Sequence, residues 1–132
     1  YSIKNGYTFA WASDVSEKGF ARNEGIAIVP EDDSKLAEAL KEPMPEKTIT
    51  QEMRQIAYDN WETTDDHGMQ IYGIAKDQNG KEYFMVKNSW GETGKYKGVW
   101  YASDAFVRYK TLNIVVHKDA LPKHIAKKLG IK

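Results

Sequence analysis

The 132-residue chain is long enough for one domain with its own core, since a chain of this size buries roughly two-thirds of its unfolded surface. Nineteen basic and nineteen acidic residues cancel, which argues against a nucleic-acid-binding protein. No apolar run approaches the roughly 20 residues of a membrane span. The lack of cysteine excludes disulfides, zinc–thiolate sites and a thiol nucleophile within the chain. We therefore expect one globular domain, residues 1–132, without metal, cofactor, nucleic acid or membrane partner.

The first half of the chain predicts one strand and two helices. An aromatic-rich run favours a strand over residues 7–12, and a polar stretch follows as far as Asp33. Leucine and alanine at helical spacing predict a short helix over residues 34–41, which two prolines end. Thr48 with Gln51 three residues later resembles a capping box, and apolar residues at helical intervals predict a helix over residues 49–60.

The second half of the chain predicts strands. Two apolar runs flank the turn-forming sequence Asp-Gln-Asn-Gly at residues 77–80, which indicates a β-hairpin. A helix capped by Asp119 and ended by Gly130 closes the chain. The predicted fold class is α+β, a bent sheet or barrel of antiparallel strands with flanking helices. The expected strands cover residues 67–76, 82–87, 98–102 and 111–117, a short segment covers 104–109, and the last helix covers 121–129.

His67 and Asn88, at the open end of the hairpin, form a candidate catalytic pair. If Lys76 pairs with Lys81 across a four-residue loop, His67 faces Trp90, and Asn88 is a diagonal neighbour at roughly 7–8 Å. A two-residue loop moves Asn88 about 13 Å away at ~3.3 Å per residue, and a three-residue loop puts the pair on opposite faces. The pair therefore requires the four-residue loop or a compensating bulge.

These residue types suit catalysis with a thiol supplied from elsewhere. A histidine beside a cysteine lowers the thiol pKa from about 8.5 to as low as ~3.5, and the imidazolium then protonates the leaving amine. An asparagine oxygen can accept a hydrogen bond from the second ring nitrogen, which fixes the tautomer without adding charge. A tryptophan on the same face can shield that bond from water and strengthen it.

The sequence around this pair resembles a known family. Asp-His-Gly-Met at residues 66–69 and Tyr-Phe-Met-Val-Lys-Asn-Ser-Trp-Gly at residues 83–91 resemble the histidine and asparagine motifs of papain-like cysteine peptidases. The form is most similar to the bleomycin hydrolase and aminopeptidase C branch, with support from Lys87, the loop 91–98 and the closing segment 106–122. The similarity covers about residues 48–129, with a weaker match near residues 11–15.

The resemblance implies the C-terminal, antiparallel β-barrel-like half of a papain fold. His67 takes the catalytic role, Asn88 orients it, Trp90 shields their bond, and Asp66 lines the cleft. The family's nucleophilic cysteine and oxyanion glutamine belong to the helical half, and none of the glutamines 51, 55, 70 and 78 precedes a cysteine here. The implied activity is peptide-bond hydrolysis by the whole thiol-dependent enzyme, while this chain alone is expected to be inactive.

The implied partners are the missing helical half and a peptide substrate, and an apolar face left uncovered predicts self-association. The chain starts at Tyr1 rather than methionine, so we expect it to be part of a longer protein. It ends at Lys132 without the tail that enforces aminopeptidase action in many family members, which leaves exopeptidase or endopeptidase action and hexamer formation open. The resemblance implies a cytoplasmic location, and the sequence leaves a secreted or periplasmic one open.

Simpler interpretations accompany these. His117 and His124 are expected to be solvated or capping residues, and Trp11, Trp61 and Trp100 to pack in the core or between the two halves. Two other functions remain open: a non-catalytic pseudo-peptidase or β-rich binding module, and a carbohydrate-binding domain that uses some of the twelve Trp and Tyr residues. Exposed, coplanar aromatic side chains would favour carbohydrate binding.

Overall fold

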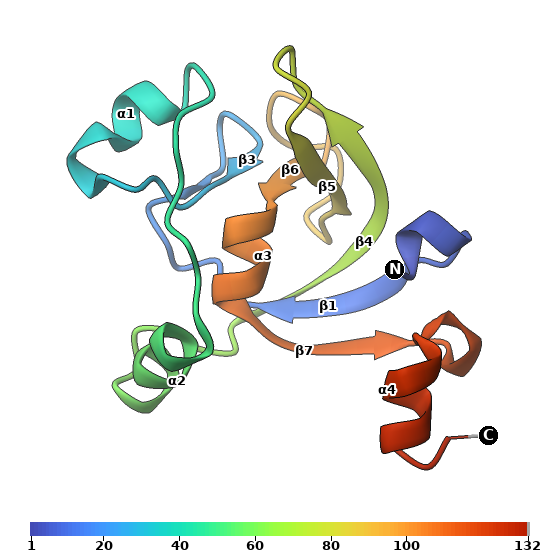
Figure 1. Cartoon of the computed structure of the whole chain (residues 1–132). Coiled ribbons are helices and arrows are strands. Elements are labelled where there is room, and N and C mark those ends of the chain that lie inside the picture. The colour runs from blue at the N-terminus through green and yellow to red at the C-terminus, as the bar shows by residue number, and fades with distance from the viewer. Residues whose placement is uncertain (132) are drawn as a thin grey trace.

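One curved, open sheet wraps around a central helix, as the computed structural model shows for residues 1–131 (Figure 1). Within these residues the strand order is β2-β3-β6-β5-β4-β1-β7. Neighbouring strands are antiparallel except β3 and β6, which are parallel. The α+β class is confirmed, whereas the expected barrel is a sheet that does not close, with β2 and β7 at its edges. The strands are β1 (Phe9–Ser13), β2 (Phe20–Ala21), β3 (Ile26–Ala27), β4 (His67–Lys76), β5 (Glu82–Lys87), β6 (Val99–Ser103) and β7 (Thr111–Val116).

Short helices cover the concave face and the ends of the sheet. Figure 1 shows α3 inside the curve of the sheet, with α1 and α2 on one side and α4 beyond the end of β7. The helices are α1 (Leu36–Ala39), α2 (Gln51–Asp59), α3 (Asp104–Lys110) and α4 (Lys123–Lys128), with 3-10 turns η1 (Ile3–Asn5), η2 (Asp33–Lys35) and η3 (Lys118–Ala120). No helix in the part of the chain that the structure describes is long and apolar enough to cross a membrane.

Two of the expected helix caps were wrong. Thr50, not Thr48, caps α2, because its hydroxyl accepts a hydrogen bond from the Met53 N–H at 3.1 Å. Asp119 lies within η3, and Pro122 takes the N-cap position of α4 without a side-chain hydrogen bond. The expected first helix is shorter than residues 34–41, since η2 occupies its first turn.

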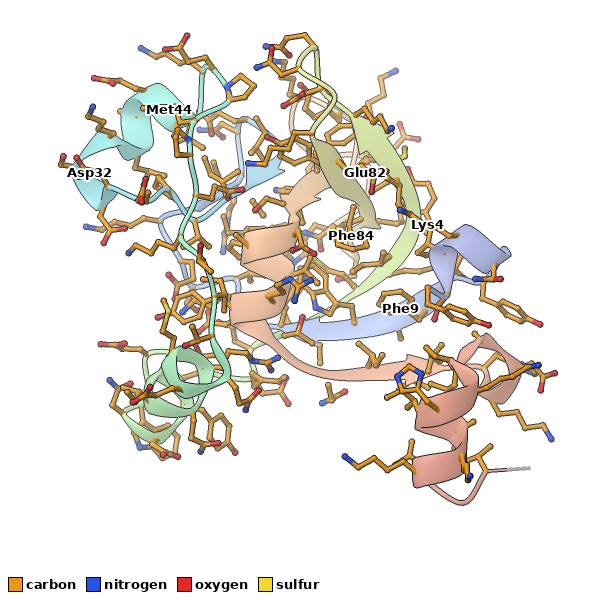
Figure 2. All side chains as sticks on the ribbon, in the orientation of Figure 1. Lys4, Phe9, Asp32, Met44, Glu82 and Phe84 are labelled. Atoms are coloured by element: carbon orange, nitrogen blue, oxygen red, sulfur yellow. The ribbon has the colours of Figure 1, made fainter. Side chains whose placement is uncertain are left out.

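The core lies between the concave face of the sheet and α3. Alternate residues of the central strands point inward, and Phe106 of α3 packs against them. Phe20 stacks on Trp100 at 5.6 Å between ring centroids and contacts Phe106 at 6.0 Å. Trp11 and Trp100 are each 1% exposed, which confirms their expected place in the core. On the outside, Lys4 of η1 pairs with Glu82 at the start of β5 at 3.2 Å (Figure 2).

The register of the β4–β5 hairpin differs from the expected one near the turn but agrees with it near the candidate pair. Lys76 pairs with Glu82, so the loop covers residues 77–81 rather than 77–80. The Asp77 carboxylate holds this loop by accepting the N–H groups of Asn79 at 2.8 Å and Lys81 at 2.9 Å. A bulge between Ile71 and Gly73 then shifts the register by one residue. The compensating bulge is therefore present, and it restores the pairing that the candidate pair requires.

Candidate active site

His67 and Asn88 are hydrogen-bonded to each other. His67 opens β4, opposite Ser13 of β1, and Asn88 follows the last residue of β5. The imidazole Nε2 lies 2.6 Å from the Asn88 Oδ1, and Asn88 is only 3% exposed. The same Oδ1 accepts the N–H of Ser89 at 2.7 Å, which fixes the carboxamide with its oxygen toward the ring.

This geometry decides which ring nitrogen carries a proton in neutral His67. A carboxamide oxygen can only accept, so Nε2 must be the donor of the bond to Asn88. The second nitrogen, Nδ1, makes no hydrogen bond to any residue from 1 to 131. His67 therefore presents an unoccupied acceptor at Nδ1 while Asn88 holds the ring in place.

Trp90 covers the imidazole. Their ring centroids lie 4.6 Å apart, with the planes inclined by 36°. Phe20 and Trp100 meet the Trp90 ring edge to face at 6.2 and 5.8 Å and hold it in this position. Asn88 is 3% exposed, and a hydrogen bond removed from water is stronger because the local dielectric is lower.

Two carboxylates link the strand ends beside His67. Asp66 accepts the N–H of Val15 at 2.9 Å and a hydrogen bond from the Ser16 hydroxyl. In the opposite direction, the buried Asp14 accepts the N–H of Thr64 at 2.7 Å. Each of the two segments, the one after β1 and the one before β4, thus supplies a carboxylate that accepts hydrogen bonds from the other. These bonds hold the backbone next to His67 in place. Asp66 is exposed beside His67, and its carboxylate is engaged with the Val15 backbone and the Ser16 hydroxyl.

The link makes the stability of the fold depend on pH. Partial burial opposes ionisation of Asp66, but the hydrogen bonds from Ser16 and Val15 outweigh it and lower its pKa below the ordinary 3.8. A carboxyl whose pKa falls on folding stabilises the fold fully above its unfolded pKa of about 3.9, and this contribution is lost as the pH falls through the lower, folded value.

We therefore expect Asp66→Asn to lower the melting temperature near about pH 7 and to differ less from the unchanged chain near about pH 2.5. Thermal unfolding followed across this range tests the expectation. Asp65→Asn is the matched control, because Asp65 is exposed and makes no hydrogen bond with residues 1–131. An offset for Asp66→Asn that stays constant with pH would contradict the assignment.

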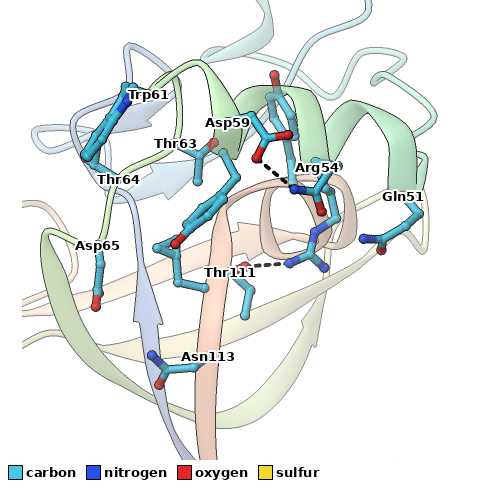
Figure 3. Close-up of a pocket in the computed structure, with 13 residues that line it drawn as sticks. Gln51, Arg54, Asp59, Trp61, Thr63, Thr64, Asp65, Thr111 and Asn113 are labelled. Carbon is cyan, nitrogen blue, oxygen red and sulfur yellow. Dashed lines mark hydrogen bonds between the residues drawn. The ribbon is translucent and has the colours of Figure 1, made fainter.

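A separate hollow of about 780 Å³ lies between α2 and the start of β7 (Figure 3). The Arg54 guanidinium donates to the Thr111 carbonyl at 2.7 Å on its floor, and Trp61, 82% exposed, stands at its edge. Asp65, two residues before His67 in the sequence, lines the hollow. Neither His67 nor Asn88 lines the hollow. Tyr58, also in the lining, is 61% exposed, and within residues 1–131 its ring makes no ring contact with that of Trp61.

The model of the Peptidase C1-like family matches residues 1–131. This chain belongs to that family. The match extends the resemblance, which the sequence placed mainly at residues 48–129, over the N-terminal part as well. A Peptidase C1-like chain with a histidine and an asparagine in hydrogen-bond contact under a tryptophan agrees with the papain-like motifs around residues 66–69 and 83–91.

Particular relatives are similar to parts of this Peptidase C1-like chain. Aminopeptidase C of Streptococcus thermophilus is 41% identical over 56 residues, 42% of this chain and 13% of that protein. Aminopeptidase C of Lactobacillus helveticus is 32% identical over 69 residues, 52% of this chain and 15% of that protein. The crystal structure of PepW from Lactobacillus rhamnosis HN001 superimposes with a TM-score of 0.63 and 26% identity, over 95% of this chain and 27% of that one. The chain thus spans between about an eighth and a quarter of these relatives.

Some features of the site carried no sequence signal. Asp14 directly follows β1 in a polar stretch, and its partner Thr64 lies 50 residues away in the sequence. Phe20 likewise belongs to a strand of two residues, too short for any periodicity. His117 caps η3 by accepting the Asp119 N–H at 3.3 Å, which confirms its expected local role.

Proposed function

We propose that this chain is the C-terminal half-domain of a thiol-dependent peptidase of the bleomycin hydrolase and aminopeptidase C type. It supplies His67 as the general acid and base and Asn88 as the residue that orients it. The observation that carries the proposal is the 2.6 Å contact between the His67 Nε2 and the Asn88 Oδ1 beneath Trp90. This arrangement leaves Nδ1 as the one ring position open to a reacting group.

The proposed chemistry requires a cysteine from the remaining part of the enzyme next to Nδ1. The thiol proton passes to Nδ1, which gives a thiolate and an imidazolium whose Nε2–H remains bonded to Asn88. The thiolate attacks the peptide carbonyl, the imidazolium gives its proton to the leaving amine, and a thioester remains on the cysteine. His67 then removes a proton from water, which hydrolyses the thioester and restores the free thiol. Asn88 adds no negative charge, so it orients the ring without neutralising it.

This chain has an exposed surface beside the site where the proposed partner, the helical half, could pack. Tyr58 of α2 and Trp61 after it line the hollow next to Asp65 and are 61% and 82% exposed. Two large aromatic side chains exposed together on one surface suit a face that another part of the enzyme covers. We propose that the helical half packs here, and that the chain self-associates through this face when that half is absent.

Complementation tests the proposal. The purified chain alone should show no hydrolysis of fluorogenic peptides, because it contains no cysteine. Co-expression with the cysteine-bearing half of the longer polypeptide, or with that of the Streptococcus thermophilus relative, should give an activity that a thiol-alkylating reagent removes. Hydrolysis by the chain alone that is lost in His67→Ala would overturn the half-domain proposal.

The absence of cysteine also fits a second function, a non-catalytic module that kept the scaffold and lost the reaction. A complex that forms with the cysteine-bearing half but hydrolyses no peptide would favour this pseudo-peptidase. The two functions therefore give opposite results in the same complementation experiment.

A further inference from the structure

Arg22 stacks on the tryptophan that covers His67. Its guanidinium carbon lies 4.6 Å from the Trp90 ring centre, the same distance that separates Trp90 from the imidazole. Arg22 therefore lies no further from the imidazole than twice that distance. A full positive charge thus lies within roughly three residues of extended peptide from the candidate general acid, since each extended residue spans at most ~3.3–3.6 Å.

The backbone of Arg22 is fixed by close packing. Arg22 lies in the turn between β2 and β3, and this turn packs against the loop 91–98. A Cβ on Gly94 would lie 3.0 Å from the Arg22 carbonyl oxygen, and a Cβ on Gly25 would lie 2.6 Å from the Tyr96 ring. The Gly25 N–H also bonds to the Ala21 carbonyl at 2.9 Å, which closes the turn. The guanidinium is therefore presented from a rigid base.

The positive charge of Arg22 is not neutralised locally. Arg22 is exposed and makes no ion pair with any residue from 1 to 131. Glu17, in the segment between β1 and β2, is engaged with Lys110 at 2.5 Å. The Arg22 guanidinium makes no hydrogen bond with residues 1–131, so its N–H groups are available to bind a carboxylate in two places at once.

The side of the substrate that Arg22 faces follows from the proposed reaction. The acyl part of the peptide is held at the nucleophile, which this chain lacks. The amine part leaves from beside the imidazole that protonates it. A cation that contacts the same Trp90 ring as His67 therefore lies next to the part of the peptide that follows the bond to be cleaved.

We propose that Arg22 is a specificity-determining residue that binds a carboxylate on the leaving-group side of the peptide. This inference rests on the proposed peptidase function and adds the class of substrate. The carboxylate belongs either to an acidic side chain after the cleaved bond or to the C-terminus of a short substrate, and the guanidinium chemistry is the same for both.

Binding to the chain alone tests this inference without any catalysis. Three dipeptides serve as probes: Glu-Ala-amide with only a side-chain carboxylate, Ala-Ala with only a terminal one, and Ala-Ala-amide with neither. Each is titrated into labelled chain while the assigned Trp90 indole N–H resonance is followed. At least one carboxylate probe should bind roughly three- to tenfold more tightly than Ala-Ala-amide, and salt should weaken the difference. The probe that shows the gain identifies the source of the carboxylate.

Two variants separate Arg22 from a general effect of charge. Arg22→Gln should remove the preference, while Lys18→Gln, which removes one exposed charge from the nearby segment between β1 and β2, should retain it. A backbone amide spectrum confirms that both variants are folded. An equal loss in both variants, or no Arg22-dependent shift with any probe, overturns the inference.

The same variants distinguish failure of this inference from failure of the proposed peptidase function. If complementation yields no hydrolysis but Arg22 still selects carboxylates, the peptidase proposal fails and carboxylate binding stands. Hydrolysis is then compared for peptides with Glu or Gln after the cleaved bond, and for short peptides with a free or an amidated C-terminus. If hydrolysis occurs but Arg22→Gln changes neither preference, the inference about Arg22 fails alone.

Discussion

Replacing His67 by alanine in the complemented enzyme should lower kcat/KM for peptide hydrolysis by about 10²- to 10⁴-fold or more. The imidazole has two tasks in the proposed reaction, because it accepts the thiol proton and then protonates the leaving amine. Loss of the ring removes both, and Asn88 cannot replace it because a carboxamide does not titrate. Steady-state kinetics with a fluorogenic peptide measures the effect.

Two controls make the His67 result specific. His117→Ala removes an exposed histidine that caps η3 and stacks on Tyr7 and makes no contact with His67 or Asn88, so it should leave kcat/KM within about twofold. Asn88→Ala retains the imidazole but removes its orienting bond, so it should give a smaller loss than His67→Ala. A His67→Ala enzyme that keeps its activity would contradict the role assigned to this ring.

The largest loss of stability is expected from Lys110→Ala. The Lys110 ammonium is 3% exposed and donates to the Glu62 carbonyl and the Thr63 hydroxyl, both at 3.0 Å. It also pairs with Glu17 at 2.5 Å. Its removal leaves these buried acceptors without a donor and Glu17 without a counter-charge. We expect a loss of about 2–4 kcal/mol, somewhat below the range for fully buried pairs because Glu17 is partly exposed.

Urea unfolding of the chain measures this loss, and Arg108→Ala on the same helix is the matched control. Arg108 forms an exposed ion pair with Asp104, which should contribute only about 0.2–1 kcal/mol. Lys110→Met, which keeps most of the apolar volume, should still cost more than Arg108→Ala because the polar acceptors remain unpaired. Equal losses for Lys110→Ala and Arg108→Ala would contradict the buried network.

The parts of the fold with strong local patterns could be predicted from the sequence. The bounds of β4 and β5 followed from apolar runs on both sides of Asp77 to Gly80, and the structure has the same bounds. β2 and β3 have two residues each, so they carry no period, and they form because β3 pairs with β6 far along the chain. The hairpin register also depends on a bulge near Tyr72, and no turn-forming residue in the sequence indicated this bulge.

The candidate site divides in the same way. His67, Asn88 and Trp90 belong to short sequence motifs, so their proximity could be derived from hairpin register and resemblance. The Asp14–Thr64 bond and the Arg22–Trp90 contact join segments about 50 residues apart or more, and such pairs leave no mark in either segment alone. Long-range partners of polar residues therefore had to come from the structure.

The ionisation of the cysteine in the complemented enzyme tests the central claim most directly. The rate of its alkylation, measured against pH, reports the thiol pKa in the complex. With the unchanged chain we expect that pKa to lie well below the free value of about 8.5, and with His67→Ala to return toward it. A thiol pKa that is the same with both chains would contradict the proposal that His67 and Asn88 form the acid–base half of a thiol peptidase.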